Sequence, residues 1–523
     1  MADKIVVSNN SALTNKYGPN GLQAVQAAIA RLVASDLTRG LQTIYVAVDD
    51  PAAMGAASGT PVTDPTDGQQ NKNAVDALYS FNKPQYVVLL GSPDVIPHQI
   101  LINPVYNPDP TNGDPDQTVP SDLPYACDAA YSQNISDFVG PGRVVSRLPD
   151  VMGATDPTYL IHVLDLATNA AVLAQAGYAD YLGVTASVWP QSTSLSLNAI
   201  FGSSGDMQSV PPAIYQWPAN LLTRRSHFFN CHGAHLSPQY FGQIGTSYPV
   251  AHDAGYITGK LTPGTVASVE CCYGAELYDP VASQIPNQQM GIANVYMGEG
   301  AYAFWGSTTI AYGPADSNAQ ADLICQYFLE QVLNGTSVGR AALSARQTCV
   351  QNNLAMGPVD LKTLGQYILL GDASIQCVPS GDAGVKAAPK FMSVGISQQG
   401  AERLSRVARR QRLAETGLML RETKAVSERS PGEPTQDIRQ KLEQVRTAAG
   451  LQSPTYASYR VIPGIEPKFP RAKTFIPLAK APTAFHLLSE GRTTTERGIK
   501  ALHIVEVMEA DGEFIRVREF FSR

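Results

Sequence analysis

The chain of 523 residues lacks several features by which common classes of protein are recognised. It has no run of about 18 apolar residues, so no transmembrane helix is predicted. The first ten residues, MADKIVVSNN, hold no basic segment followed by a long apolar stretch, and so do not resemble a signal peptide. Seven cysteines are few and odd in number, which argues against a disulfide framework. We therefore expect a cytoplasmic protein without a membrane partner.

Basic side chains are also scarce over most of the chain. Residues 1–400 carry 16 Lys and Arg against 30 Asp and Glu, whereas residues 401–523 carry 22 against 15. The overall net charge of −7 hides this asymmetry. An acidic body argues against nucleic acid as the main partner, although the basic tail leaves that alternative open. With 44% hydrophobic and 16% charged residues, the chain as a whole is predicted to be globular.

Short apolar runs alternate with helical patterns along the first 380 residues. Strands are predicted at residues 4–8, 43–48, 85–90, 181–185, 226–230, 265–269, 301–305 and 366–370, and helices at 21–34, 74–79 and 317–334. Such alternation is typical of mostly parallel sheets covered by helices. We therefore expect two α/β/α subdomains, at residues 1–178 and 179–380. Segments 51–72 and 103–124, rich in turn-forming residues, are predicted to be loops.

The composition changes after residue 380. Residues 381–454 are expected to form a linker and a charged helical arm, because residues 401–450 contain 18 charged side chains and no aromatic one. Such a segment cannot build a core alone, so it is either a solvated helix pair or a mobile arm that proteases can reach. Residues 455–523 regain aromatic side chains, and alternating runs around Asp511-Gly512 predict a β-hairpin. We expect a small β-rich module there.

Two predicted strands run directly into polar residues followed by glycine. One ends in Asn230-Cys231-His232-Gly233, and the other in Glu270-Cys271-Cys272-Tyr273-Gly274. Parallel α/β sheets place their active sites at such carboxyl ends. A cysteine and a histidine on neighbouring strand ends can act as nucleophile and base, because the imidazole helps to generate the thiolate and later protonates the leaving amine. The N–H groups of Gly233 and of the nucleophile Cys272 are candidates for an oxyanion site.

Other interpretations of these residues stay open. Cys272 and His232 could be structural, because free cysteine is among the most buried residue types. A zinc site could be built from Cys231, His232, His235, Cys271 and Cys272, although no CxxC pair is present and the HxxH spacing follows a strand. His235 fits better as a loop residue or a wall of a specificity pocket. We expect no metal and no cofactor, and no GxSxG, P-loop or dinucleotide-binding glycine pattern occurs.

The two strand ends together resemble clan CD cysteine proteases, and the gingipain family in particular. In that clan a His-Gly pair is followed, about forty residues later, by an acidic residue or Gln, a small residue, the catalytic Cys, one further residue and a small residue. The sequence from Glu270 to Gly274 fits that frame with Cys272 as nucleophile and Cys271 at the small position. Adjacent side chains on a strand point to opposite faces, so only one of the two cysteines can face His232.

Further segments match the gingipain pattern in order over residues 1–380. They are Val88-Leu89-Leu90-Gly91 with Asp94 and Pro97, Pro120-Ser121-Asp122 with Tyr125-Ala126, Gly142-Arg143 with Arg147-Leu148-Pro149, and parts of 300–308, 335–341 and 367–372. The resemblance implies a caspase-like second subdomain and peptidase activity. It implies that Asp122 is a supporting acid, which either orients His232 or caps a turn. It also implies that Tyr312 and Asp316 receive a basic P1 side chain, unless Asp316 is the N-cap of the following helix.

Gingipains are secreted, whereas this chain shows no export signal, so a different setting is expected. Between Arg225 and Arg340 the only basic residue is Lys260, whereas the arm offers many. If P1 is Arg or Lys, the candidate processing sites are Arg406, Arg409, Arg410, Arg412, Arg421 and Lys424. We expect a zymogen whose arm and module dock on the acidic body, acting on protein substrates in a bacterial regulatory or defence cascade under an upstream protease or regulator. The alternatives are a charged linker to an accessory domain, and a non-catalytic caspase-like scaffold that binds a partner through its tail.

Overall fold

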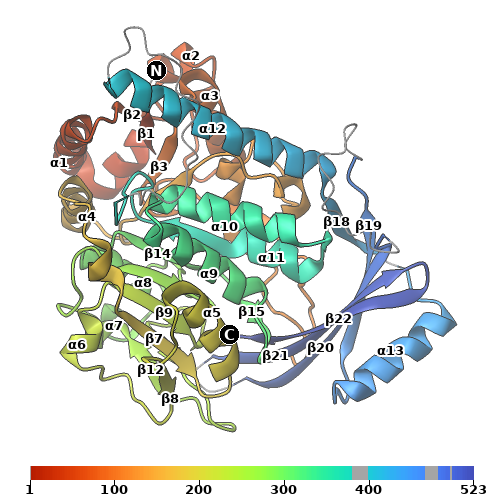
Figure 1. The fold of residues 1–523 in the computed structure, drawn as a ribbon. Helices are drawn as coiled ribbons and strands as arrows, with labels where there is room; N and C mark the ends of the chain where they lie inside the picture. The colour runs from red at the N-terminus through yellow and green to blue at the C-terminus, as the bar shows by residue number, and fades with distance from the viewer. Residues whose placement is uncertain (1, 380–397, 431, 466–480, 495–497) are drawn as a thin grey trace.

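The computed structural model describes residues 2–379, 398–430, 432–465, 481–494 and 498–523 (Figure 1). Its body is built on one ten-stranded sheet. From edge to edge the strands are β2 (Thr43–Ala47), β1 (Lys4–Ser8), β3 (Tyr86–Leu90), β6 (Val145–Leu148), β17 (Tyr367–Leu370), β14 (Ala303–Ser307), β13 (Val266–Val269), β9 (Ser226–Asn230), β7 (Tyr181–Ala186) and β8 (Gln208–Val210). Every neighbouring pair is parallel except β17 with β14. The predicted α/β class with mostly parallel strands is confirmed.

The two halves of the body share this sheet. β6 lies in the N-terminal half and β17 in the second half, and the two strands pair at Arg147 and Leu370. Buried side chains from both halves form one hydrophobic cluster that extends from Ile5 to Val378. Central parallel strands are buried on both faces, which explains why they are short runs of apolar residues. The two expected subdomains are therefore joined through one continuous sheet and one core.

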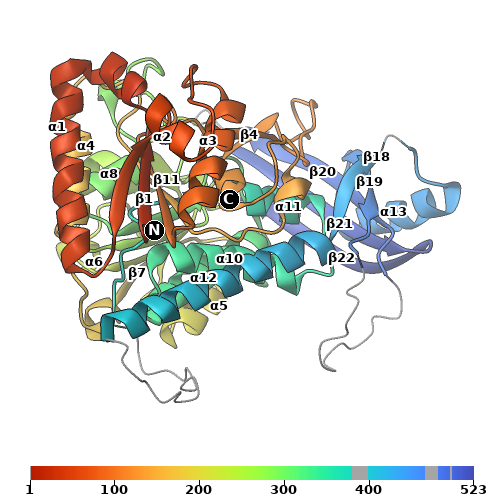
Figure 2. The ribbon, with the colours of Figure 1, turned by 90° about the horizontal axis from the view of Figure 1, so that it is seen from above.

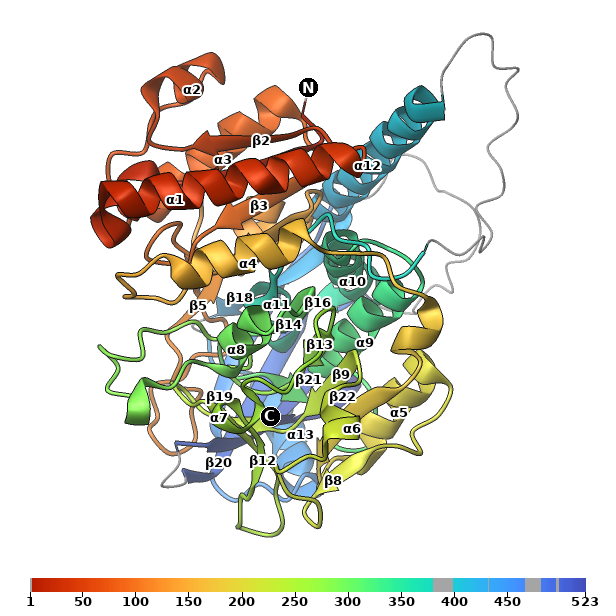
Figure 3. The same ribbon diagram turned by 90° about the vertical axis from the view of Figure 1, so that its left-hand side faces the viewer.

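Helices cover both faces of the sheet (Figure 3). One group contains α1 (Asn10–Thr38), α4 (Thr158–Thr168) and α8 (Ile292–Gly298), and a second group contains α5 (Pro190–Phe201), α9 (Gln320–Leu333) and α10 (Val338–Asn352). The shorter helices of the body are α3 (Gly68–Asn82), α6 (Ala219–Leu222), α7 (Ala254–Ile257) and α11 (Pro358–Gln366). Ile324, Phe328 and Val332 give α9 a buried face against β13 and β14. This packing fixes the first turn of α9 near the carboxyl end of the sheet.

Two segments that were expected to be loops contain regular structure. α2 (Pro51–Ala56) begins with proline, and the carboxylate of Asp50 accepts hydrogen bonds from the N–H groups of Ala52 and Ala53. β5 (Thr118–Ser121) pairs antiparallel with β4 (Gln99–Ile102). The loop predictions are wrong there. For α2 the reason is that Asp and Pro favour helix starts as well as loops, whereas β5 is a short strand formed by pairing with β4.

The C-terminal residues form a second large sheet of seven strands. Its order is β15 (Tyr312–Gly313), β22 (Glu513–Ser522), β21 (Lys500–Ala510), β20 (Ala484–Thr494), β19 (Thr455–Ile462), β18 (Ala425–Ser430) and β16 (Ala355–Met356). The predicted hairpin joins β21 to β22, and Asp511 and Gly512 both have positive φ, as a type I′ turn requires. Helix α13 (Gln436–Ala448) packs its Ile438 and Leu442 against this sheet. Both edge strands come from the body, so the module is bound to the body at two places.

The charged arm is a helix that lies across the body (Figure 2). This helix is α12 (Gln398–Thr423), and residues 380–397 of the expected linker lie outside the described residues. The remainder of the expected arm is not a helix alone, because β18 and α13 belong to the C-terminal sheet and its packing. Gln347 of α10 donates to the carbonyl oxygen of Leu413 at 2.9 Å, and Lys424 donates to that of Asn353 at 2.6 Å. The arm is therefore packed against the body along the described part of its length. None of the described helices is long and apolar enough to cross a membrane.

Candidate active site

The carboxyl ends of β9 and β13 lie side by side, because the two strands are parallel neighbours. β9 continues into β10 (His232–Gly233), which begins a small sheet with β11 (Gln239–Phe241) and β12 (Val250–Asp253). β13 continues into the segment that carries Cys272. A Cβ atom on Gly233 would lie 1.8 Å from the carbonyl oxygen of Cys272, so only glycine lets the two segments approach so closely. The structure thus brings His232, Gly233 and Cys272 together, as the sequence predicts.

The two adjacent cysteines face opposite sides of this strand end. Cys271 belongs to the core of the main sheet, and its carbonyl oxygen accepts from Ser307 Oγ at 2.8 Å. Cys272 belongs to a separate cluster beside the C-terminal sheet, and its Sγ accepts from the N–H of Ala311 at 3.3 Å. Burial raises the pKa of the Cys272 thiol to about 12, although the Ala311 N–H favours the thiolate. Cys272 is therefore the cysteine on the side of β22, and it is a neutral thiol near pH 7.

The imidazole of His232 is buried between Trp189 and Tyr248, whose ring centroids are 4.4 and 5.0 Å from its own. Its Nε2 lies 2.7 Å from Gln243 Oε1. An amide oxygen only accepts hydrogen bonds, so Nε2 carries the proton and Nδ1 is the basic nitrogen. Among the described residues Nδ1 has no hydrogen-bond partner. Burial lowers the pKa of His232 to about 4, against the opposing effect of Gln243. No motif in the sequence indicates Gln243.

Asp122 does not contact His232. Its Oδ1 and Oδ2 accept from Arg147 Nη2 and Nε at 2.6 and 3.0 Å, and Oδ1 also lies 2.8 Å from His98 Nδ1. Burial would raise the pKa of this carboxyl, but Arg147 and His98 outweigh burial and hold the pKa well below its usual range. The expectation that Asp122 orients His232 is therefore wrong, because both of its oxygens are used to hold Arg147 and His98.

The end of strand β22 lies against the Cys272 segment. β22 pairs antiparallel with β15 along Phe521 and Ser522. The next residue, Arg523, continues this pairing and donates its N–H to the carbonyl oxygen of Ala311 at 2.9 Å. We use the term Cys272 site for Cys272, His232, Gly233 and the segment 311–314. The last residues of β22 therefore run through this site as an extended strand.

The main-chain oxygen of Arg523 lies between the two N–H groups that the sequence nominates for an oxyanion site. It accepts from the N–H of Cys272 at 3.2 Å and from the N–H of Gly233 at 3.3 Å. Two backbone donors that converge on one carbonyl oxygen are the arrangement by which acyl-transfer enzymes hold a tetrahedral oxyanion. The geometry can therefore polarise a peptide carbonyl group beside the Cys272 thiol.

The side chain of Arg523 is fully buried in a pocket beside this oxygen. Its Nη2 donates to the carbonyl oxygen of Pro314 at 2.6 Å and lies 3.0 and 3.3 Å from the two carboxylate oxygens of Asp322. The guanidinium carbon lies 4.3 Å from the ring centroid of Trp189. A Cβ atom on Gly313 would come within 2.3 Å of Arg523 Nη2, so the glycine leaves room for the guanidinium. The pocket therefore combines a charge, a carbonyl acceptor and an aromatic face.

Two more buried polar residues interact with Asp322. Asn230 Nδ2 donates to Asp322 Oδ1 at 3.3 Å. Glu270 is fully buried, and burial together with the nearby Asp322 raises the pKa of Glu270 well above its usual range. The raised pKa favours the neutral form of Glu270, and Asp322 is the carboxylate that pairs with Arg523.

The residues expected to form the specificity pocket lie elsewhere. Asp316 is exposed, and α9 begins four residues later with Ala319 at its N-cap, so Asp316 neither contacts Arg523 nor caps the helix. The carboxylate that contacts the Arg523 guanidinium is instead Asp322, in the first turn of α9. Tyr312 is buried, and its hydroxyl donates to Asp114 at 2.7 Å rather than facing the guanidinium. The main chain of Tyr312 contributes instead, because it pairs with β22.

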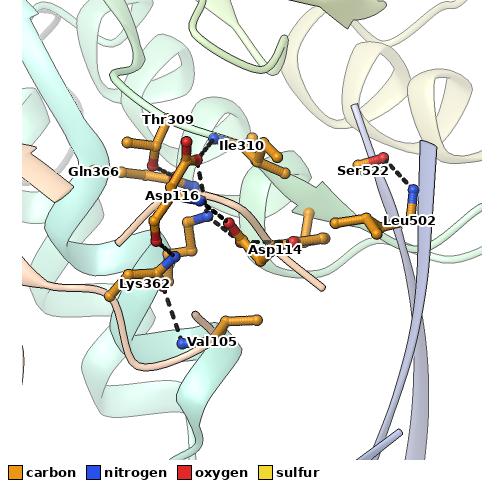
Figure 4. Close-up of polar contacts among 12 residues, drawn as sticks. Val105, Asp114, Asp116, Thr309, Ile310, Lys362, Gln366, Leu502 and Ser522 are labelled. Atoms are coloured by element: carbon orange, nitrogen blue, oxygen red, sulfur yellow. Dashed lines mark hydrogen bonds and ion pairs between the residues drawn. The ribbon is translucent and has the colours of Figure 1, made fainter. Parts of the chain in front are cut away.

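A cluster of buried charges supports the segment that pairs with β22 (Figure 4). Lys362 of α11 forms an ion pair with Asp114 and lies 3.5 Å from Asp116. Asp116 Oδ2 accepts from the N–H of Ile310 at 3.0 Å. Beside the cluster, Thr309 Oγ1 donates to Gln366 Oε1 at 2.7 Å. The segment 309–312 is thereby fixed from both sides, which holds Ala311 next to the thiol.

The other candidate residues lie apart from this arrangement. His235 is exposed and pairs with Glu276 at 2.6 Å, which raises the pKa of His235. The described residues hold no group of three His, Cys, Asp or Glu suited to a metal ion, and the seven cysteines are free thiols. The processing candidates Arg406, Arg409, Arg410, Arg412, Arg421 and Lys424 lie in α12 or directly after it. A protease binds its substrate extended, so α12 would have to unwind locally before any of them were cut.

Comparisons with known proteins add little to this geometry. No family model matches the chain, and no curated protein matches it. A solved structure described as a protease aligns at 12% identity over 99% of this chain and 96% of its own, with a TM-score of 0.44. A chain of the Saccharomyces cerevisiae separase–securin complex aligns at 11% identity over 44% of this chain and 14% of its own, with a TM-score of 0.26. At such scores neither likeness carries an argument about activity, and membership of the gingipain family stays a prediction.

Proposed function

We propose that the chain is a cysteine endopeptidase that uses Cys272 and His232 and cleaves after basic residues. The observation that carries this proposal is the position of Arg523. Its main-chain oxygen lies between the N–H groups of Cys272 and Gly233 while its guanidinium contacts Asp322. A peptide with arginine in the P1 position would present its scissile carbonyl group and its side chain to the same groups.

In the proposed reaction Nδ1 of His232 takes the proton of the Cys272 thiol, and the thiolate sulfur bonds to the P1 carbonyl carbon. The carbonyl π electrons move to the oxygen, and the N–H groups of Cys272 and Gly233 stabilise its negative charge. The C–N bond then breaks, and the imidazolium gives its proton to the leaving amine. Water hydrolyses the thioester with His232 as base. Gln243 accepts from Nε2 and so keeps Nδ1 available throughout.

The pocket favours arginine over lysine in P1. A planar guanidinium can donate to Pro314 and Asp322 at once while it stacks on Trp189. A lysine ammonium is a point charge without a planar face, so it would keep the ion pair and lose the stacking. The rest of a substrate is expected to add to β15 as an antiparallel strand, as extended peptides add to free sheet edges elsewhere.

Regulation by the C-terminal part is included in the proposal. We infer a zymogen that is processed in its basic arm and acts on protein substrates in a bacterial regulatory or defence cascade in the cytoplasm. The charge asymmetry supports this inference, since residues 401–523 carry the excess of basic side chains and the body carries the acidic ones. The contact of Arg421 with Asp128, at 3.2 Å, is one ion pair between arm and body.

A non-catalytic scaffold is the second candidate, and one observation favours it. In this structure Cys272 and His232 are 3% and 2% exposed, and burial holds both of them in their neutral forms. A scaffold would keep this closed state permanently. An enzyme must open the site, after which the thiol and the imidazole regain water and can exchange a proton.

A peptide-library screen with varied P1 residues tests the activity. Two backgrounds are screened, the wild type and Arg523→Ala. Each background is tested unchanged, with Cys272→Ala, and with Cys271→Ala as the matched control. We expect cleavage after Arg, weaker cleavage after Lys, loss of all cleavage with Cys272→Ala and retention with Cys271→Ala. Cleavage that survives Cys272→Ala, or that a chelator abolishes, would contradict the proposal. Folded protein that cleaves nothing in either background would support the scaffold.

A further inference from the structure

Strand β22 reaches the Cys272 site from within the same chain. We propose that β22 is an intramolecular ligand of this site, in which Phe521, Ser522 and Arg523 occupy the P3, P2 and P1 positions and exclude other substrates. The proposal rests on the proposed peptidase function and adds the identity of the inhibitor. The inhibitor is β22 together with Arg523, which follows it, rather than the basic arm.

The backbone contacts of β22 use the groups that a substrate would need. β15 pairs with Phe521 and Ser522, and Ala311 accepts from the N–H of Arg523 at 2.9 Å. The two N–H donors of Cys272 and Gly233 are both directed to the Arg523 oxygen. A second peptide could not pair with the same edge of β15 while β22 is bound. Occupation of the site is therefore exclusive.

The Arg523 side chain and the pocket depend on each other. A buried guanidinium needs a carboxylate, and Asp322 is fully buried with no other cation paired to it among the described residues. Removing Arg523 would leave the charge of Asp322 beside Glu270 without a counter-charge until water or a substrate cation entered. The pocket is thus electrostatically complementary to a cation. The chain supplies this cation itself, as the guanidinium of Arg523.

The module holds β22 in place from its other side. β22 pairs along its length with β21, and Arg518 of β22 contacts Asp360 of α11 at 2.8 Å. At the other edge of the module β18 pairs with β16 of the body. A ligand held in this way acts at an effective concentration of roughly millimolar or above, so a micromolar peptide competes poorly with it. Cutting α12 alone would leave these sheet contacts intact, so release of β22 must accompany activation.

Burial by β22 also accounts for the resting state of the two reactive groups. The pKa of the Cys272 thiol is raised to about 12 by burial, and that of His232 is lowered to about 4, with the charge of Arg523 as a contributing cause for His232. Departure of β22 would admit water to both groups and remove that charge. The same strand would thus both exclude substrate and suppress formation of the thiolate.

The first test measures hydrolysis of a peptidyl-arginine coumarin substrate by four full-chain forms. They are the wild type, Arg523→Ala, a form that lacks residues 521–523, and Arg516→Ala as the matched control on the exposed part of β22. We expect kcat/KM to rise about 10- to 100-fold for Arg523→Ala, and at least as much for the shortened form, as the cis ligand is weakened or removed. Arg516→Ala should match the wild type. Thermal unfolding of each form checks that it is folded.

The second test measures binding without catalysis. In the Cys272→Ala background, a fluorescein-labelled peptide with the sequence of residues 518–523, Arg-Glu-Phe-Phe-Ser-Arg, is titrated into the intact chain and into the form that lacks 521–523. We expect binding only to the shortened form, and none by the same peptide ending in Ala. Equal hydrolysis or equal binding by intact and shortened forms overturns the inference while leaving the peptidase proposal standing. Binding only to the shortened form, with no hydrolysis by any form, supports β22 as the ligand and rejects the peptidase.

Discussion

Two buried ion pairs lie close to Cys272, and they differ in where the cation comes from. Lys362 pairs with Asp114, and Arg523 pairs with Asp322, and all four side chains have no exposed surface. Both partners of the first pair belong to the body, in α11 and the loop after β4. In the second pair the cation is carried by the end of β22. The Lys362–Asp114 pair is therefore a fixed part of the body. In the Arg523–Asp322 pair, by contrast, the cation is a ligand that another cation could replace.

The surroundings of the two carboxylates match this difference. Asp114 also accepts from the Tyr312 hydroxyl, so several groups of the body satisfy it at once. From the body, Asp322 has hydrogen bonds with Asn230 and Glu270, and no cation of the body pairs with it in the described part of the chain. Buried charges are stable when paired and costly when left alone. The Asp322 pocket is consequently incomplete without an incoming cation, which is the property of a binding site.

The largest expected effect comes from neutralising the incomplete pocket. Asp322→Asn, made in the form that lacks residues 521–523, should lower kcat/KM for a P1-arginine substrate by about 1,000-fold, roughly 4 kcal/mol, because a buried guanidinium would lose its partner. Asp316→Asn is the matched control, since Asp316 is exposed, and should change kcat/KM by less than about twofold. Steady-state kinetics with Arg and Lys substrates measures both. If Asp316→Asn lowered kcat/KM more than Asp322→Asn does, Asp316 rather than Asp322 would determine the P1 specificity.

The sequence predicts most strands of the body, because most are short apolar runs that end in glycine or a polar residue. It misses β6, which holds Ser146 and Arg147, and the three-residue β8. The strands at 4–8, 226–230 and the hairpin at Asp511-Gly512 are found as predicted. What the sequence does not reveal is how the elements combine. Nothing in the sequence of β6 or β17 indicates that they pair and join two halves into one sheet. The two-residue edge strands β15 and β16 are too short to leave any periodic pattern.

The site was predictable as far as strand ends determine it. His232, Gly233 and Cys272 converge because their strands are parallel neighbours. The pattern places both motifs at strand ends, and the resemblance to clan CD proteases implies that these ends are adjacent. Asp322 was missed because a carboxylate in the first turn of a helix is ordinarily a favourable dipole interaction, with no sign of a ligand. The contact of Arg523 with Asp322 spans 201 positions in the chain, and no local signal encodes it. A basic residue at the end of an alternating strand was the one available hint.

Breaking the fixed pair should lower the free energy of unfolding more than breaking the exchangeable pair does. Lys362→Met should lower the free energy of unfolding by about 3 kcal/mol, because Asp114 would remain buried without its counter-charge. Arg523→Ala should cost less, since displacement of the weakened β22 would admit water to Asp322. Urea unfolding of both variants measures the difference. Adding Asp114→Asn to Lys362→Met should recover part of the loss, and equal losses for the two single variants would remove the distinction between support and ligand.

The smallest effect concerns pH and reports whether the site is closed. Burial lowers the pKa of His232 to about 4, so the folded protein holds the neutral imidazole more strongly than the unfolded chain does. Protonation of the unfolded chain therefore costs no stability above the ordinary histidine pKa near 6.5, and stability is lost as the pH falls from there toward 4. Between pH 7 and pH 5 this residue should cost the wild type about 2 kcal/mol of stability. His232→Gln should remove that part of the pH dependence, and exposed His162→Gln should not. In Arg523→Ala the loss should shrink, because water reaches the imidazole and the neighbouring positive charge is gone. Urea unfolding at the two pH values measures all four chains, and an unchanged pH dependence in Arg523→Ala would mean that β22 does not close the site.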